Sequence, residues 1–238
     1  MGLARTNRGT GSIAYTSNST LTITSGSFTP PVDALLLCLW SEVTTDATPD
    51  MVLTATGFTI TSPAYLSIVQ DDGFGNYAVC RIAYCRVLTS AAGTLVCTRG
   101  AGTFTMGAHA EWIEITGEGI AAPVPQYITN VLAGSATFPL NLPSAPAASS
   151  MVFTNCIDAG GTTPTVPSGF TALGNFSMGF NSANGEDLAS AAQNNDWTTP
   201  STFYAIGVMV EIIEAPIDVP ELRYGMGRAR MANRVYRM

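Results

Sequence analysis

The residue types that most often perform chemistry are sparse in this chain, and the single histidine is the first to consider. His109 has no Gly-x-Ser-x-Gly turn to partner it, and no serine or cysteine stands at a spacing that suggests a triad with a carboxylate. An enzyme of another kind, such as a glycosidase, would require a cleft that collects several of the scattered acids. We therefore expect His109 to be a plain residue at the edge of a strand, and the protein to be no enzyme.

Residues 71–76 read Asp-Asp-Gly-Phe-Gly-Asn and form an acidic turn, whose oxygens could bind Ca²⁺. The segment lacks the spaced acids of an EF-hand loop, and Asp-Gly pairs are common in hairpin turns. The sequence therefore favours a turn, with no metal and no cofactor.

One tryptophan lies among polar residues: Trp197 follows Asn194, Asn195 and Asp196. An exposed indole flanked by amides could stack on a sugar ring. These four residues would then bind a glycan of a receptor on the host surface. The alternative is a tryptophan folded down over the end of a sandwich, because large aromatic side chains usually bury most of their area.

The five cysteines contain no Cys-x-x-Cys pair, and their number is odd. Cys80 and Cys85 are five residues apart, so on one strand they would point to opposite faces and could not share a metal. We expect five buried free thiols that pack as small apolar side chains, as in proteins folded in a reducing cytoplasm.

Composition favours a structural or binding protein. The chain is 46% hydrophobic and 11% charged, against about 25% charged in ordinary soluble domains. It contains no run of about eighteen apolar residues, so no transmembrane helix is predicted, and its first residues show no apolar segment of a secretory signal.

The charge is distributed unevenly along the chain. Residues 222–238 carry five Arg and no acid, whereas the preceding 221 residues carry 5 − 17 = −12. A basic tail on an acidic body usually binds an acidic partner, and Arg pairs bidentately with carboxylates. The predicted partner is a neighbouring subunit, with DNA as the less favoured alternative. The residues expected to make this contact are Arg223, Tyr224, Arg228, Arg230, Arg234, Tyr236 and Arg237.

The chain reads as a series of short strands, several of which alternate polar and apolar residues with a period of two. Residues 35–40 are instead a continuous apolar run, which predicts a strand buried on both faces. Residues 94–98 are expected to form a hairpin with 77–87, and 186–194 are the only candidate helix. Further strands are expected at 20–24, 54–61, 110–116, 138–142, 151–153 and 203–213.

Three landmarks occur twice in the same order: a Pro-led apolar strand, a Gly-Phe-Thr turn and a closing apolar strand flanked by Glu. We therefore expect an internal duplication and an all-β fold of two tandem antiparallel β-sandwich, jelly-roll-like domains. The expected division is an N-terminal arm at 1–18, a first sandwich at 19–118, a linker at 119–130, a second sandwich at 131–216, and the Arg-rich C-terminal tail at 217–238.

Two segments carry a resemblance to a known group of proteins. Residues 28–36, Phe-Thr-Pro-Pro-Val-Asp-Ala-Leu-Leu, are similar to the opening of β-sandwich modules in virion proteins of tailed bacteriophages. Residues 167–173, Pro-Ser-Gly-Phe-Thr-Ala-Leu, resemble a turn of the same modules. The resemblance covers about the first 60 residues of each half and contains no catalytic motif.

This resemblance implies a non-enzymatic structural component of a bacteriophage virion, made in the host cytoplasm. A tail, baseplate or fibre component is preferred over a capsid decoration protein, and a carbohydrate- or receptor-binding module is a further alternative. The expected partners are other virion proteins and further copies of the chain in a homo-oligomer, with no insertion into a membrane.

Overall fold

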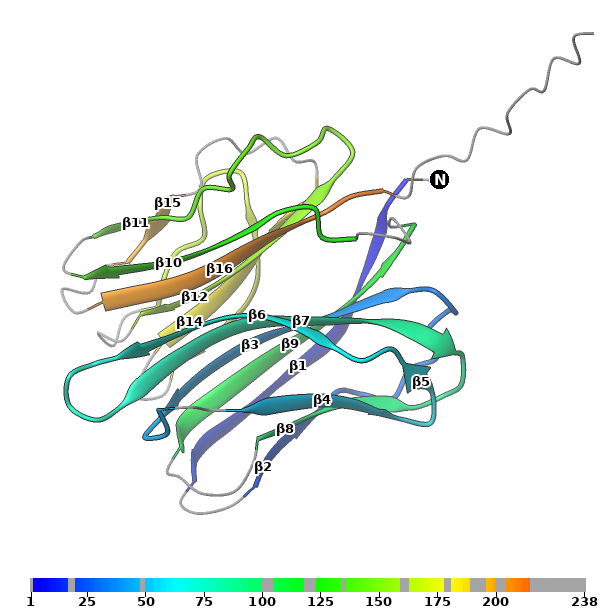
Figure 1. The fold of residues 1–238 in the computed structure, drawn as a ribbon, viewed down its shortest axis with the longest axis horizontal. Helices are drawn as coiled ribbons and strands as arrows, with labels where there is room; N and C mark the ends of the chain where they lie inside the picture. Colours follow the sequence, from blue (N-terminus) through cyan, green and yellow to red (C-terminus); the bar gives the residue numbers. More distant parts are fainter. Residues whose placement is uncertain are drawn as a thin grey trace, which may run out of the picture.

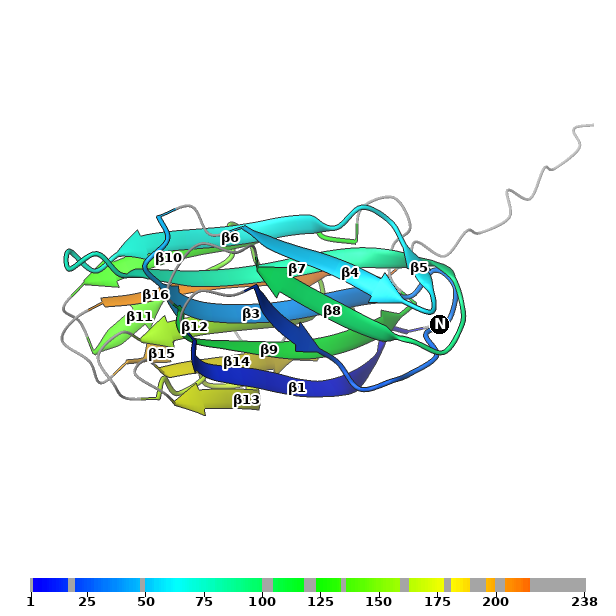
Figure 2. The same cartoon turned by 90° about the horizontal axis from the view of Figure 1, so that it is seen from below.

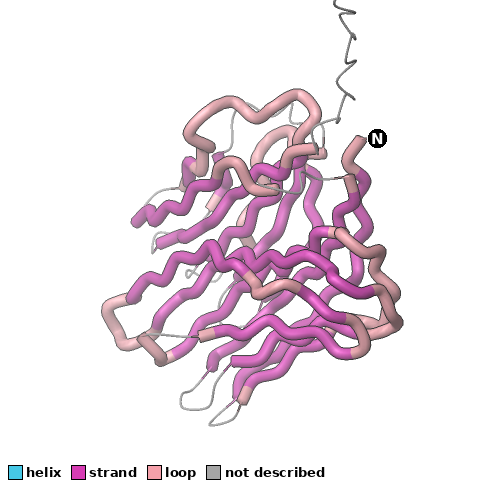
Figure 3. Tube along the Cα trace, turned by 45° about the vertical axis from the view of Figure 1, so that its right-hand side comes forward, coloured by secondary structure: helices cyan, strands magenta, loops and turns pink. Residues whose placement is uncertain are grey.

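The computed structural model describes residues 2–16, 20–47, 50–99, 105–117, 123–133, 136–158, 163–177, 181–188, 196–199 and 204–214. Strands linked by turns and loops make up these residues, and no helix occurs among them (Figure 3). The all-β prediction is therefore confirmed.

The first half of the chain builds a large sheet and a small one. The large sheet has the strand order β1-β9-β3-β7, with β5 and β6 both paired to β7. The small sheet has the order β2-β8-β4. The strands are β1 (Ala4–Thr16), β2 (Leu21–Thr24), β3 (Leu35–Thr44), β4 (Met51–Thr56), β5 (Thr59–Ile60), β6 (Ala64–Asp71), β7 (Tyr77–Thr89), β8 (Thr94–Arg99) and β9 (Thr105–Thr116).

The second half also builds a large and a small sheet. The large sheet has the order β10-β16-β12-β14-β13, and β11 pairs with β15 in the small one. The strands are β10 (Tyr127–Ala133), β11 (Thr137–Pro139), β12 (Met151–Asp158), β13 (Thr171–Ser177), β14 (Asn181–Asp187), β15 (Asp196–Thr198) and β16 (Tyr204–Ile212).

The strand order of the first half recurs in the second. Strands β1, β9, β3, β7 and β6 correspond to β10, β16, β12, β14 and β13, and an isolated bridge from Thr165 to Thr198 stands where β4 pairs with β8. The turn glycines Gly57 and Gly169 also correspond, with φ angles of 87° and 90°. This common order agrees with the duplication that the sequence landmarks predict.

The four sheets stack as layers, with the two large sheets in the middle and a small sheet on each outer side (Figures 1 and 2). A core lies in each of the three gaps. The central core joins the halves, because alternate residues of β3, including Leu35 and Leu37, pack with Phe153, Ile157 and other residues of the second large sheet.

Strand β3 shows why this stack forms. All ten of its residues are buried, so the prediction of a strand covered on both faces is confirmed. Leu36, Cys38 and Trp40 point toward the small sheet, whereas Leu35 and Leu37 point toward the second half. An alternating strand could leave one face in water, but this apolar run needs a layer on each side.

Several predicted elements differ from the structure. The predicted N-terminal arm is largely strand β1, paired with β9 over its length. Its Arg, Asn and Gly residues concealed this strand, because they form no alternating apolar pattern. Strand β8 pairs with β2 and β4 instead of forming a hairpin with β7, since the turn after β7 carries the chain into the other sheet.

Two smaller predictions also fail. The segment expected as one strand at 54–61 is broken into β4 and β5 by the turn at Gly57. Residues 186 and 187 of the candidate helix end strand β14, where burial between two layers outweighs helix propensity, and 189–194 lie outside the described residues.

Candidate functional site

The residues predicted to bind partners are described only in part. The Arg-rich tail and both Asn194 and Asn195 lie outside the described residues. Trp197 is 0% exposed within the core between the outer small sheet and the second large sheet, and its Nε1 donates to Thr154 Oγ1 at 3.3 Å. Its ring therefore offers no surface on which a sugar could stack, which contradicts Trp197 as a glycan platform and agrees with the alternative of a folded-in tryptophan.

The cysteine prediction is confirmed. All five cysteines are free and buried. Cys80 faces the central core and Cys85 faces the core of the first half, as their odd spacing predicts. Burial raises the pKa of Cys85 to about 12, so this thiol stays protonated at neutral pH and is a poor nucleophile.

The sequence suggested that His109 lies at the edge of a strand. It lies instead within β9, which is flanked by β1 and β3 in the large sheet. It is 3% exposed, faces the second half of the molecule, and stacks on Phe176 with ring centroids 5.8 Å apart. Desolvation lowers its pKa to about 4, so the imidazole is neutral at pH 7. No feature of the sequence indicated this burial, because it depends on how the halves pack.

Glu111 lies two residues from His109 on the same face of β9 and is 0% exposed. Asn7 Nδ2 donates to its Oε1, while its Oε2 has no hydrogen-bond partner. Desolvation raises the pKa of Glu111 to about 7, although the bond from Asn7 and the nearby Arg5 oppose this rise. A Cβ on Gly174 of β13 would stand only 2.8 Å from Oε2, so the carboxylate packs against bare backbone of the other half.

A polar strip lies between the two large sheets and consists of His109, Glu111, Arg5, Glu186 and Asn155. Arg5 pairs with Glu186, and Asn155 joins β12 to β3 by accepting from Ser41 Oγ at 2.9 Å and donating to the Trp40 carbonyl at 2.8 Å. His109 and Glu111 thus form a buried acid and base beside each other, but their burial places them in the packing between the halves, away from solvent.

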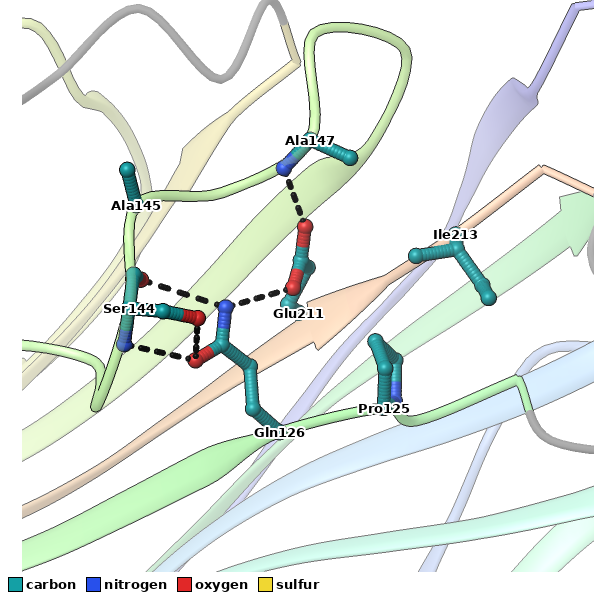
Figure 4. A pocket seen from close by; sticks show the side chains of 7 residues that line it. All are labelled: Pro125, Gln126, Ser144, Ala145, Ala147, Glu211 and Ile213. Atoms are coloured by element: carbon teal, nitrogen blue, oxygen red, sulfur yellow. Dashed lines mark hydrogen bonds between the residues drawn. The ribbon is translucent and has the colours of Figure 1, made fainter.

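A surface pocket of about 310 Å³ lies where strands β10 and β16 meet the loop before β12. Gln126 Nε2 donates to Glu211 Oε2 at 2.7 Å, and Gln126 Oε1 accepts from the Ser144 amide at 3.0 Å (Figure 4). Glu211 Oε1 accepts from the Ala147 amide at 2.6 Å. Both side chains are thereby used to hold this loop on the sheet.

The acidic turn at 71–76 is a hydrogen-bonded hairpin tip between β6 and β7. Asp72 Oδ1 accepts the amides of Phe74 at 2.7 Å and Asn76 at 3.0 Å, and Asp72 Oδ2 accepts Asn76 Nδ2 at 2.7 Å. Partial burial opposes ionisation of Asp72, but these bonds prevail and lower its pKa. The sequence predicted this turn from its Asp-Gly pair.

Within the described ranges, no three His, Cys, Asp or Glu side chains are grouped so that they could hold a metal ion. No helix in that part of the chain is long and apolar enough to cross a membrane. No protein family, curated protein or solved structure matches this chain.

Proposed function

We propose that this protein is a non-enzymatic structural component of a bacteriophage virion that assembles through protein–protein contacts. A position in the tail, baseplate or fibre is preferred, and capsid decoration is the alternative. Each half is then a jelly-roll-like sandwich, and the sandwiches stack through their large sheets. The assignment to a phage rests on the resemblance of residues 28–36 and 167–173 to virion modules.

The observation that carries the assembly role is the hairpin tip at 71–76. Its aromatic residue, Phe74, is 82% exposed, yet five backbone and side-chain hydrogen bonds fix the loop that presents it. A rigid loop that holds an aromatic ring in water is typical of a residue that becomes buried in a contact, since aromatic residues are enriched in interface cores.

The second contact in this proposal is made by the Arg-rich tail, because the tail is basic and the rest of the chain is acidic. The Arg-rich tail binds carboxylates of a neighbouring subunit, with its Tyr and Met side chains filling a half-apolar groove. Alone, the tail has too little apolar area to offset an ordering entropy of roughly 1–2 kcal/mol per residue.

Two experiments test the proposal, one on purified virions and one on a chain that lacks the tail. Quantitative mass spectrometry of purified virions should find the chain in a fixed ratio to the other structural proteins. Deleting residues 221–238 should leave the circular dichroism spectrum and thermal unfolding of the body unchanged but abolish incorporation. Absence of the chain from purified particles would overturn the virion assignment, and normal incorporation of the truncated chain would overturn the anchoring role.

A binding measurement separates protein from DNA as the partner of the tail. Five positive charges on DNA would give binding that weakens steeply between low and physiological salt. No binding of duplex DNA at low salt leaves the protein partner, which is the expected result.

A further inference from the structure

Phe74 is more exposed than any other large hydrophobic residue in the described part of the chain. The hairpin that joins β6 to β7 lies at one end of the molecule (Figure 1), and Phe74 is part of its tip. Gly73 and Gly75, with φ of 78° and 87°, allow this tight turn. Because the loop is fixed before any contact forms, burying Phe74 would cost little conformational entropy.

A small pocket lies near the other end of β7. Its volume is about 170 Å³, and Leu35 and Cys85, both buried, contribute to its lining. A cavity of about 150 Å³ with apolar walls can hold a benzene ring, so this pocket has the size for one phenylalanine side chain. The other lining residues are Thr61, Ser62, Ala64, Tyr84, Arg86 and Pro123.

Phe74 and this pocket cannot meet within one molecule. Phe74 precedes the first residue of β7, whereas Tyr84 and Arg86 lie near its end. At about 3.3 Å per residue, the seven residues of strand from Tyr77 to Tyr84 separate the base of the hairpin tip from the pocket by roughly 23 Å. A contact between Phe74 and this pocket therefore has to join two copies of the chain.

The charges around the two features are complementary. Asp71 and Asp72 precede Phe74 in the same hairpin tip, where their carboxylates also accept hydrogen bonds within the turn, and the pocket is lined by Arg86, whose guanidinium also donates to the Asp33 carbonyl at 3.2 Å. An aromatic ring that enters the pocket would thus bring two carboxylates toward an arginine. Complementary charges at the rim of a contact favour one register and one partner over others.

We propose that copies of this protein associate head to tail, with Phe74 of one copy inserted into the pocket between Leu35, Ala64 and Tyr84 of the next. Such a contact uses different surfaces on the two copies, so it extends into a ring or a filament instead of closing as a two-fold dimer. The inference rests on the proposed function in one respect: that function expects copies of the chain to associate, and the inference assigns the contact between them. It is tested on purified protein alone.

The test measures self-association of the full-length protein by sedimentation velocity and light scattering over a range of concentrations. Phe74→Ser should raise the dissociation constant at least tenfold, as expected for a central aromatic anchor. Ser62→Trp, placed at an exposed position of the pocket lining, should do the same by filling the pocket. Val52→Ser, which removes another exposed apolar side chain (48% exposed) on β4, is the matched control and should change nothing.

A mixing experiment distinguishes this geometry from a symmetric one. Phe74→Ser retains an intact pocket and Ser62→Trp retains an intact Phe74, so an equimolar mixture should form heterodimers that cannot grow, while each variant alone stays monomeric. A symmetric contact between two Phe74 tips gives no such heterodimer and would overturn the inference.

Three further outcomes would also overturn it. These are a wild-type protein that stays monomeric at millimolar concentration, a Phe74→Ser variant that associates like Val52→Ser, and association that is lost on deleting residues 221–238 but unaffected by Phe74→Ser. The last result would assign self-association to the tail. Because none of these measurements uses phage particles, they leave the virion assignment to its own test.

Discussion

A deeply buried ion pair lies in the first half. Arg99 and Glu42 are each 1% exposed, and Arg99 Nε lies 2.7 Å from Glu42 Oε1. Arg99 Nη2 donates to Thr44 Oγ1 at 2.6 Å, and Trp40 Nε1 donates to Glu42 Oε2 at 3.3 Å. Nothing in the sequence around either residue indicated this pair, because the partners come from strands more than fifty residues apart.

Glu42→Gln should lower the free energy of unfolding by about 3–5 kcal/mol, since it leaves the buried Arg99 charge without its main counterion. Urea denaturation followed by tryptophan fluorescence measures the change. Asp46→Asn is the control: Asp46 is 33% exposed and lies 3.5 Å from Arg99, so solvent screens this pair and its loss should cost less than about 1 kcal/mol. Equal losses for the two variants would show that burial does not set the strength of the pair.

The buried pair His109 and Glu111 links stability to pH in opposite directions. The pKa of Glu111 is raised from 4.5 to about 7 in the folded state, so the unfolded state releases a proton first and stability falls as pH rises from 4.5 to 7. The pKa of His109 is lowered from 6.5 to about 4, so the unfolded state takes up a proton first and stability falls as pH drops from 6.5 to 4.

The single variants should therefore show opposite pH profiles. Each group changes stability by about 1.4 kcal/mol per pH unit, so the two nearly cancel between pH 4.5 and 6.5 in the wild type. Relative to the His109→Gln/Glu111→Gln double variant, His109→Gln should lose about 3 kcal/mol from pH 4.5 to 7. Glu111→Gln should gain about 3 kcal/mol from pH 4 to 6.5, both measured by urea unfolding in steps of half a pH unit. Parallel profiles for the two single variants would refute this assignment of the charges.

Strands with a strong apolar pattern could be predicted from the sequence, and polar strands could not. The continuous run that begins β3 and the long alternating pattern of β7 predicted their strands and their buried faces. Strand β1 contains two Arg, two Gly and an Asn, and it holds its place by pairing with β9 rather than by apolar burial. Strand β14 is equally polar, because Ser182, Asn184 and Glu186 face the strip between the halves.

Two glycine turns in the first half differ in how closely other backbone approaches them. Gly57 and Gly73 both have positive φ, but a Cβ on Gly57 would stand 2.1 Å from the Ala92 carbonyl oxygen, whereas a Cβ on Gly73 meets nothing within 4 Å. Gly73→Ala should cost about 1–2 kcal/mol for the backbone conformation alone. Gly57→Ala should cost at least twice as much, because two backbone segments must also move apart. Thermal unfolding of both variants measures the difference, and equal costs would mean that the close approach of β4 and β8 at this turn is easily relieved.

Two tandem halves could also have been joined by a linker without packing against each other, and the sequence landmarks do not distinguish these two arrangements. The signal for face-to-face packing was nevertheless present in residues 35–40, since a strand of a two-layer sandwich has only one face to bury. A strand that is apolar on both faces requires a third layer, and the second half supplies it. What the sequence could not reveal is that the same gap also contains His109, Glu111 and Asn184, because their polar character suggests solvent.

The shared central core predicts that the two halves fold as one unit. Beside the polar strip, each large sheet buries apolar side chains against the other, such as Leu37 and Ile82 from one half and Phe153 and Val208 from the other. A half made alone would expose these side chains, and exposed apolar patches of that kind favour aggregation. Denaturant unfolding of the whole chain should therefore show one cooperative transition with coincident fluorescence and circular dichroism.

Phe153→Ala tests this coupling directly, because Phe153 is 0% exposed in the central core. The cavity should cost about 3–5 kcal/mol and move the single transition as a whole to lower denaturant. Val52→Ser, on the outer face of β4, is the control and should change stability by less than about 0.5 kcal/mol. Two separate transitions, with only the one belonging to the second half shifted by Phe153→Ala, would show that the sandwiches fold independently and that their contact adds little to stability.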